Sequence, residues 1–211
     1  MSGRGDVVRG RFVVFEGGEA TGKSTQARML AERWGAVLTR EPGGTHLGEV
    51  LRDVVLDPEQ ANLADRTEAL LFAAARAQHV TEVIEPALAA GRDVVCDRFA
   101  ASSFAYQSYG RGLPLEEVRS LSAFAVDGTW PDLNVLLVVP AEVAESRLGE
   151  RDRLEQVGDG FHRRVAAGFE ALAAAEPGRW VRIDATGTID EVAARVRDAV
   201  ESRLRRPRGD R

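Results

Sequence analysis

The sequence predicts an α/β protein built on one parallel sheet with helices on both faces. Short apolar runs alternate with helical stretches along the chain, which is the pattern of buried parallel strands joined by crossover helices. No repeat, linker or low-complexity tract divides the chain. A length of 211 residues suffices for one full α/β core but not for two ordinary domains and a linker. We therefore expect a single domain over residues 1–211.

Short apolar runs predict the strands, and apolar residues at helical spacing predict the helices. An apolar run precedes a glycine-rich loop, and the segment after that loop places Ala27, Leu30, Ala31 and Trp34 at helical spacing. Pro114 is expected in the first turn of its helix, where a missing N–H costs nothing. The predicted strands are 12–15, 37–39, 93–96, 133–139 and 180–183. The predicted helices are 24–34, 47–56, 67–90, 114–126, 141–148, 161–175 and 189–204.

Composition excludes several classes of protein. With 44% hydrophobic and 29% charged residues, the chain is expected to be soluble and globular, and no apolar run is long enough to span a membrane. A single cysteine, Cys96, cannot form an internal disulfide or a cysteine zinc site. The polar start, without an apolar signal segment, predicts a cytoplasmic protein. The net charge of −5 argues against nucleic-acid binding, and the basic tail 205–211 is expected to fray.

The most specific motif is a phosphate-binding loop. Of 28 basic residues only Lys23 is a lysine, and it lies within Gly17-Gly18-Glu19-Ala20-Thr21-Gly22-Lys23-Ser24, which fits the pattern G-x-x-x-x-G-K-[ST]. Such a loop wraps backbone N–H groups around phosphates, and its compact ammonium bridges them where a guanidinium would be too bulky. The order strand, loop, helix adds the positive end of a helix to the anion site. The sequence therefore predicts a nucleoside-triphosphate site.

Further polar residues follow the predicted strands, at the edge where ligands of open α/β sheets bind. Asp97 and Arg98 follow the third strand, where the carboxylate could hold the water shell of Mg²⁺ and the guanidinium a phosphoryl group. Phe72 and Arg76 share a helix face and could stack on and hydrogen-bond a nucleobase. The alternatives are a structural ion pair for the first two residues, and a core phenylalanine beside a surface arginine for the second two.

Two loops carry additional arginines. Arg52 lies on the helix that follows Thr39-Arg40-Glu41-Pro42-Gly43-Gly44-Thr45, a tight loop that could equally be an ordinary turn beside a solvated arginine. Residues 147–158, which we call the lid, contain Arg147, Arg151 and Arg153 next to a glycine. We expect the lid to be a mobile charged flap, with a solvated helix end as the alternative.

Taken together, these segments resemble the thymidylate (dTMP) kinases. The resemblance rests on six segments in order, which are 15–25, 39–52, 66–79, 96–107, 130–137 and 151–156. It implies the P-loop kinase fold with a five-stranded parallel sheet, a homodimer, and phosphorylation of dTMP to dTDP by ATP and Mg²⁺ in dTTP biosynthesis. The alternatives are a kinase for another small acceptor, such as a deoxynucleoside, and a P-loop regulatory ATPase without a small acceptor.

The resemblance also implies roles for individual residues. Lys23, Asp97, Arg98 and Arg153 would be catalytic, and Mg²⁺ would be held by Ser24 and, through water, by Asp97. ATP would be bound by Gly17, Gly18, Glu19, Ala20, Thr21, Gly22, Lys23, Ser24, Thr25 and Arg147. The dTMP contacts would be Glu19 to the 3′-hydroxyl, Arg52 and Arg98 to the 5′-phosphate, and Phe72 stacking on thymine. Arg76, Ser103 and Gln107 would contact the base, Tyr106 would lie under C2′, and Glu41 would be a further dTMP-binding residue.

One position departs from part of the family. Some members carry an arginine directly after the acidic residue of the phosphate loop, whereas this chain has Ala20. The sequence therefore resembles the bacterial class in which the lid supplies the catalytic arginine. Arg153 is the first candidate for that role, and Arg147 and Arg151 are the alternatives. Phe99 stands where tyrosine or histidine is common, and we expect little consequence.

Overall fold

The computed structural model describes residues 8–60, 62–147, 153–154 and 156–204. The expectations for Arg151, for part of the lid and for the 205–211 tail lie outside these described residues. Within the described part of the chain, no helix is both long enough and apolar enough to cross a bilayer.

The described strands form one parallel sheet of five, in the order β2-β3-β1-β4-β5. The strands are β1 (Phe12–Glu16), β2 (Val37–Arg40), β3 (Val94–Asp97), β4 (Leu133–Val138) and β5 (Trp180–Asp184). The predicted α/β class, the parallel sheet and its five strands are confirmed. The register pairs Phe15 with Asp97 in the neighbouring strand. This alignment brings the residues that follow β1 and β3 to the same edge of the sheet.

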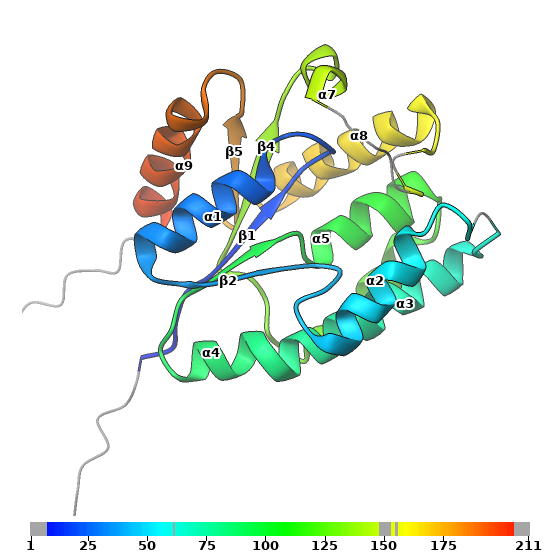
Figure 1. Cartoon of the computed structure of the whole chain (residues 1–211), viewed down its shortest axis with the longest axis horizontal. Coiled ribbons are helices and arrows are strands. Elements are labelled where there is room, and N and C mark those ends of the chain that lie inside the picture. Colours follow the sequence, from blue (N-terminus) through cyan, green and yellow to red (C-terminus); the bar gives the residue numbers. More distant parts are fainter. Residues whose placement is uncertain (1–7, 61, 148–152, 155, 205–211) are drawn as a thin grey trace, which may run out of the picture.

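Helices cover both faces of the sheet, as Figure 1 shows. α1 (Lys23–Trp34) and α9 (Ile189–Arg203) share one apolar cluster with Val13 and Phe15 of β1. The other cluster contains Phe12 and Val14 of the same strand. On that side lie the helices α3 (Asp65–His79), η1 (Val80–Ile84), α4 (Glu85–Ala89), α5 (Ala100–Ser103), η2 (Phe104–Gly110), α6 (Leu115–Val126) and α8 (Asp159–Ala175). Because successive side chains of β1 enter opposite cores, that strand reads as a continuous apolar run.

Two further helices, α2 (His46–Leu56) and α7 (Ala141–Arg147), lie near the carboxyl ends of the strands. α2 packs on α3, and α7 follows β4. Thr45 caps α2 by accepting a hydrogen bond from the Gly48 N–H at 2.9 Å. Thr188 and Glu191 form a capping box at the start of α9.

The structure adds one helical stretch that the sequence did not predict. Residues 100–110 form α5 and the π-helical η2, in which the polar side chains of Ser103, Gln107 and Ser108 are buried together with the apolar ones. The stretch is buried on several sides, with Ala100, Ala105, Tyr106 and Gln107 all inaccessible, so the amphipathic signal of a surface helix is missing. The predicted helix 67–90 is found as α3, η1 and α4 in succession.

The prediction for Pro114 was wrong by one position. Pro114 is the N-cap of α6, with an extended ψ of 126°, and does not lie in the first turn. The helix begins at the next residue, Leu115. The missing N–H of Pro114 therefore lies just before the helix, where no intrahelical hydrogen bond requires it.

Candidate active site

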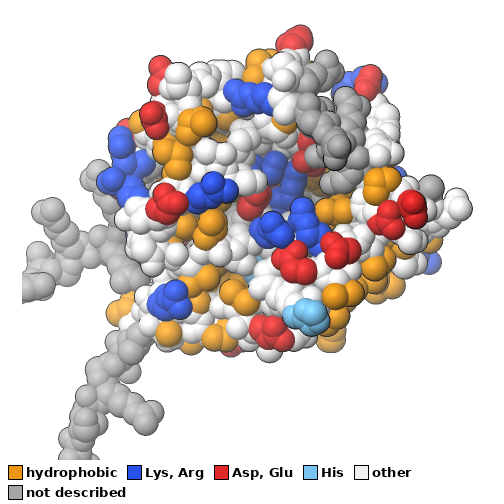
Figure 2. All heavy atoms as spheres, viewed as in Figure 1, with side chains coloured by type: hydrophobic (Ala, Val, Ile, Leu, Met, Phe, Trp, Pro, Cys, Tyr) orange, Lys and Arg blue, Asp and Glu red, His pale blue; other side chains and the backbone are white. Residues whose placement is uncertain are grey.

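A cavity of about 230 Å³ opens at the edge where β1 and β3 end, and charged side chains gather around this hollow in Figure 2. Every residue that the sequence assigned to dTMP lines this cavity: Glu19, Glu41, Arg52, Phe72, Arg76, Arg98, Ser103, Tyr106 and Gln107. Lys23, Ser24 and Asp97 line it as well. These residues come from four of the six segments that carry the resemblance, which are 15–25, 39–52, 66–79 and 96–107.

The phosphate loop is shaped by glycines and closed by Lys23. Gly17 has φ of 140°, and a Cβ there would lie 2.4 Å from the carbonyl oxygen of Leu137, so only glycine fits. Nζ of Lys23 donates to the Gly18 carbonyl at 2.5 Å and is 94% buried. Burial and the nearby Arg98 charge lower the pKa of Lys23 to about 8. The lysine remains mostly protonated at pH 7.

Ser24 and Asp97 form an oxygen-rich pair at the start of α1. Oγ of Ser24 donates to Oδ2 of Asp97 at 2.5 Å. A hydroxyl and a carboxylate are hard oxygen donors, which is the ligand chemistry that Mg²⁺ prefers, so the pair fits this ion. Among the described residues, no three His, Cys, Asp or Glu side chains cluster to hold a metal.

Arg98 is fixed in the cavity by both its backbone and its side chain. Its φ of 67° lies in the left-handed region, which is uncommon for a residue other than glycine. Its guanidinium donates to the Gly17 carbonyl at 2.9 Å, to Oγ of Ser102 at 3.2 Å and to Oε1 of Glu19 at 2.8 Å. Arg98 therefore ties the residues after β3 directly to the phosphate loop.

Glu19 is ionised despite its burial. Burial raises the pKa of Glu19, but the charges of Arg98 and Lys23 and a hydrogen bond from the Tyr106 hydroxyl outweigh burial and lower it to about 2. The Tyr106 ring packs edge-on against Phe161 and Phe169, with centroids 6.0 and 6.2 Å away. Tyr106 therefore presents its ring to the cavity from a fixed position.

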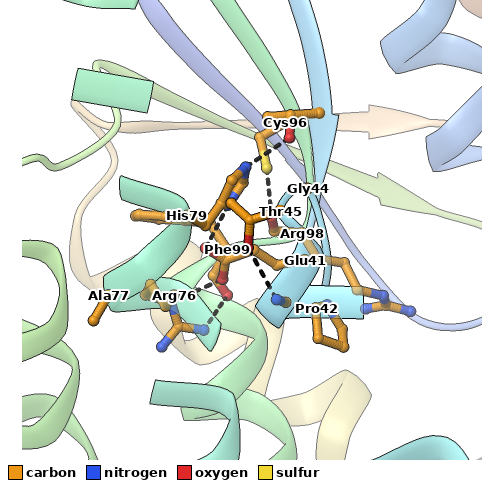
Figure 3. A network of polar contacts seen from close by, with 12 residues as sticks. Glu41, Pro42, Gly44, Thr45, Arg76, Ala77, His79, Cys96, Arg98 and Phe99 are labelled. Atoms are coloured by element: carbon orange, nitrogen blue, oxygen red, sulfur yellow. Dashed lines mark hydrogen bonds and ion pairs between the residues drawn. The ribbon is translucent and has the colours of Figure 1, made fainter. Parts of the chain in front are cut away.

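Arg76 is held by a buried polar network, shown in Figure 3. It is 2% exposed, so the alternative of a surface arginine is excluded. Nε of Arg76 donates to Oε2 of Glu41 at 2.8 Å, and Nη2 donates to Oγ of Ser103 at 3.0 Å. His79 contacts the other oxygen of Glu41 at 3.1 Å and the Thr39 hydroxyl at 2.6 Å. Glu41 therefore joins two residues of α3 to the loop after β2.

Glu16 is a buried residue that supports the wall of the cavity, and the sequence did not single it out. It is fully buried at the end of β1 and accepts hydrogen bonds from the N–H groups of Phe99 at 3.0 Å and Ser102 at 3.2 Å. The Ser102 hydroxyl donates to its second oxygen at 2.6 Å. Burial raises the pKa of Glu16 to about 7. Glu16, His79 and Thr39 carry no sequence signal because their partners are distant in the chain.

The lid arginines are placed differently from one another. Arg147 is exposed at the last residue of α7. Arg153 is 8% exposed and binds Glu68 and the carbonyl of Val55, so its hydrogen bonds to described residues go to α2 and α3. The structure does not bring Arg153 against the phosphate loop. Arg52 donates to the Pro42 carbonyl at 2.9 Å, in the tight loop that the sequence predicted.

Comparison with known proteins agrees with this geometry. A sequence model of the family named thymidylate kinase matches residues 15–196. The thymidylate kinase of Synechococcus sp. (strain JA-2-3B'a(2-13)) is 52% identical over 198 residues, which cover 92% of this chain and 95% of that protein. The thymidylate kinase of Synechococcus sp. (strain JA-3-3Ab) is 54% identical over 200 residues, which cover 92% and 96%.

The fold agrees as well. The crystal structure of thymidylate kinase from Ehrlichia chaffeensis superimposes with a TM-score of 0.74 at 32% identity, covering 92% of this chain and 99% of that one. The fold is therefore that of the P-loop kinases. On the family match, on these relatives and on a cavity lined by the motif residues, the chain belongs to the thymidylate kinase family.

Proposed function

We propose that this member of the thymidylate kinase family transfers the γ-phosphoryl group of ATP to the 5′-phosphate of dTMP, producing ADP and dTDP for dTTP synthesis. One observation carries the proposal. The 230 Å³ cavity is lined by Phe72 and Arg76, which suit a base, and by Lys23 and Arg98, which suit phosphates. A cavity lined by both kinds of residue fits a nucleotide that accepts a phosphoryl group.

The donor end consists of the phosphate loop. Backbone N–H groups of residues 17–25 and the ammonium of Lys23 would hold the ATP phosphates, with the positive end of α1 behind them. Ser24 and Asp97 would hold Mg²⁺, which when bound neutralises charge on the transferred phosphoryl group. Lys23 now donates to the Gly18 carbonyl and would exchange this acceptor for a phosphate oxygen.

The acceptor end positions dTMP. Arg98 and Arg52 would bind its 5′-phosphate, and Glu19 would accept a hydrogen bond from the 3′-hydroxyl. Phe72 would stack on thymine, while Arg76, Ser103 and Gln107 hydrogen-bond the base. Glu41 contributes by orienting Arg76 through the 2.8 Å ion pair. The Tyr106 ring would lie under C2′ and leave no room for a 2′-hydroxyl.

Phosphoryl transfer between two anions requires positioning and charge neutralisation more than covalent chemistry by the protein. Lys23 and Arg98 would neutralise charge from the two sides of the reacting oxygens. Because Ala20 leaves the loop without an arginine, a lid arginine would supply the remaining charge. Of the two described lid arginines we favour Arg147, the exposed last residue of α7, because Arg153 is bound to Glu68.

We also propose that the chain forms a homodimer. On α2, Leu47, Val50 and Val54 recur at helical spacing and remain 38–47% exposed. Leu70 of α3 and Phe124 of α6 are exposed by 57% and 87%. Because α3 packs against both α2 and α6, these side chains lie on adjacent helices, and Figure 2 shows hydrophobic side chains along the α2–α3 edge. Exposed apolar side chains on three helices that pack side by side support burial against a second copy.

A coupled assay of ADP release tests the function. Purified protein with ATP and Mg²⁺ should release ADP when dTMP is added, and much more slowly with thymidine or with no acceptor. The Lys23→Met variant is the matched control for contaminating kinases. Release that is equally fast without acceptor would favour a regulatory ATPase, and release that requires thymidine would favour a nucleoside kinase. We place the reaction in the cytoplasm, where ATP and dTMP are available.

A further inference from the structure

Glu68 of α3 is a fully buried carboxylate that lies beside the acceptor cavity rather than in it. Its two oxygens accept four hydrogen bonds. Oε1 accepts from Nε2 of Gln107 at 2.9 Å and from Nε of Arg111 at 3.3 Å. Oε2 accepts from Nη2 of Arg111 at 3.0 Å and from Nη2 of Arg153 at 2.5 Å. We call Glu68, Gln107, Arg111 and Arg153 the Glu68 cluster.

The electrostatics of the cluster favour an ionised Glu68. Burial raises the pKa of this carboxyl, but the hydrogen bonds from Arg111, Gln107 and Arg153 outweigh burial and lower it. Asp65, on the same helix, lies 3.6 Å from Arg111 and is half exposed. A buried carboxylate with every accepting position filled is rigid, because losing any partner leaves charge without compensation.

Arg153 also attaches its own segment to the end of α2. Its Nε donates to the Val55 carbonyl at 2.8 Å, and its backbone N–H donates to the Leu56 carbonyl at 3.1 Å. These carbonyls belong to the last turn of α2, where no intrahelical N–H is available. The segment at Arg153 is thereby held by main chain and side chain together.

The cluster reaches the acceptor cavity at three points. Gln107 lines the cavity, and it is a residue for which the sequence predicted a contact with the base. Leu154, next to Arg153, is 7% exposed and lines the same cavity, as does Leu56 of α2. Each of these wall residues is joined to Glu68 directly or through Arg153. Glu68 therefore connects three walls of the cavity, which come from α2, from η2 and from the lid at Leu154.

We propose that Glu68 and Arg153 act as one positioning unit that sets the dTMP-binding geometry of the cavity. The proposal rests on the proposed function, because it assigns Gln107, Leu56 and Leu154 to the acceptor nucleotide. It gives Arg153 a role different from charge neutralisation at the transferred phosphoryl group. A positioning unit acts on acceptor binding, whereas a catalytic arginine acts on the chemical step.

The two roles are separated by steady-state kinetics and by dTMP binding measured calorimetrically without ATP. We compare Glu68→Gln, Arg153→Met, the double variant and wild type. The control is Arg182→Met, which removes an exposed ion pair with Glu170 at 2.9 Å, far from these helices in sequence. Arg153→Lys is a rescue variant that restores the positive charge but not the planar guanidinium with its several donors.

Both single variants should raise KM and Kd for dTMP by about 10-fold, the change expected for a coupling of about 1.4 kcal/mol, with kcat and KM for ATP little changed. The double variant should bind dTMP no more weakly than the weaker-binding single variant, because either single change already removes the Glu68–Arg153 contact. Arg153→Lys should recover part of the dTMP affinity. Arg182→Met should match wild type.

Three results would overturn the proposal. One is a large loss of kcat in Arg153→Met at unchanged dTMP affinity, which would make Arg153 catalytic. Another is multiplicative losses in the double variant, and a third is unchanged dTMP binding in folded variants. If Glu68→Gln does not fold, the Arg153→Met and Arg153→Lys pair still decides between the two roles. A wild type that neither binds nor phosphorylates dTMP would instead refute the proposed function.

Discussion

Oε1 of Glu19 lies 2.8 Å from Nη2 of Arg98, so an acid of the phosphate loop and the arginine after β3 are ion-paired across the candidate active site. Oε1 of Glu19 also accepts a hydrogen bond from the Tyr106 hydroxyl. The two residues proposed to hold opposite ends of the dTMP sugar-phosphate therefore hold one another. Acceptor binding must use donors and acceptors that this pair has already oriented.

The Glu19→Gln variant tests the proposed contact with the 3′-hydroxyl. A neutral amide of the same size removes a charge-assisted hydrogen bond, which is worth about 1.5–3 kcal/mol, or roughly 10–150-fold in kcat/KM. Wild type should prefer dTMP over its 3′-deoxy analogue, and this preference should shrink in the variant. Equal losses on both nucleotides would assign Glu19 to orienting Arg98 alone. The KM for ATP serves as the internal control.

The raised pKa of Glu16 predicts that the free energy of unfolding falls as the pH rises. Its pKa of about 7 in the folded chain lies above the ordinary value of 4.5, so folding favours the protonated carboxyl. This stabilisation is complete below pH 4.5 and is lost as the pH rises to about 7. The shift corresponds to about 3 kcal/mol in the free energy of unfolding. Denaturant unfolding at pH 5 and pH 8 measures it.

The matched variant for this measurement is Glu16→Gln, whose amide resembles the protonated acid and can still accept from the Phe99 and Ser102 N–H groups. Relative to this variant, wild type should lose stability between pH 5 and pH 8. Parallel stability curves for the two proteins would show that Glu16 stays ionised across this range.

Base selection should depend on Arg76 and Phe72. We expect a modest preference for dTMP over dUMP, because one buried methyl is worth about 1 kcal/mol, or roughly 5-fold, and one missing carbon typically changes kcat/KM by ~10–200-fold. dCMP should be rejected more strongly, since its exocyclic amine would face the donors of Arg76. Comparison of kcat/KM for the three nucleotides measures both preferences. Similar efficiency on dCMP and dTMP would contradict the proposed base contacts.

Sugar selection should depend on the Tyr106 ring. Wild type is expected to use ribothymidine monophosphate poorly, because the ring would meet a 2′-hydroxyl. Tyr106→Phe keeps the ring between Phe161 and Phe169 and should keep this discrimination, while Tyr106→Leu should relax it. Tyr106→Ala would add a core cavity costing about 3–5 kcal/mol and is less informative. The ratio of kcat/KM for the two nucleotides is the measurement, and an unchanged ratio in Tyr106→Leu would refute the steric role.

The catalytic arginine of the lid is predicted to act in the chemical step. The sequence made Arg153 the first candidate, but its contacts with Glu68 direct the first test to Arg147. An arginine that neutralises the transferring phosphoryl group is worth ~10³–10⁵ in kcat. Arg147→Ala should therefore lower kcat by orders of magnitude at similar dTMP affinity in single-turnover experiments. A normal chemical step in this variant would move the prediction to Arg151.

Local patterns were enough to predict the fold. The signals used were properties of nearby residues. Apolar runs such as Phe12–Phe15 predicted the five strands, and the helical spacing of residues such as Ala27, Leu30 and Trp34 predicted helices. The phosphate loop and the Asp97-Arg98 pair were recognisable because their chemistry requires fixed spacing next to a strand. The same logic failed for α5 and η2, whose burial on several sides removes the periodic signal.

Only the tertiary structure decided how the candidate site is supported. Arg76 proved to be buried and held by Glu41, 35 residues away, rather than exposed on α3. Glu68 meets Arg153 across 85 residues, and Glu16 meets Phe99 across 83. Nothing in the sequence near either partner marks such pairs, because the packing of distant elements brings them together. By itself the sequence therefore determined the sheet and the phosphate loop, and its resemblance to a family named residues that line the cavity. Which buried charges hold those residues in place was decided by long-range packing.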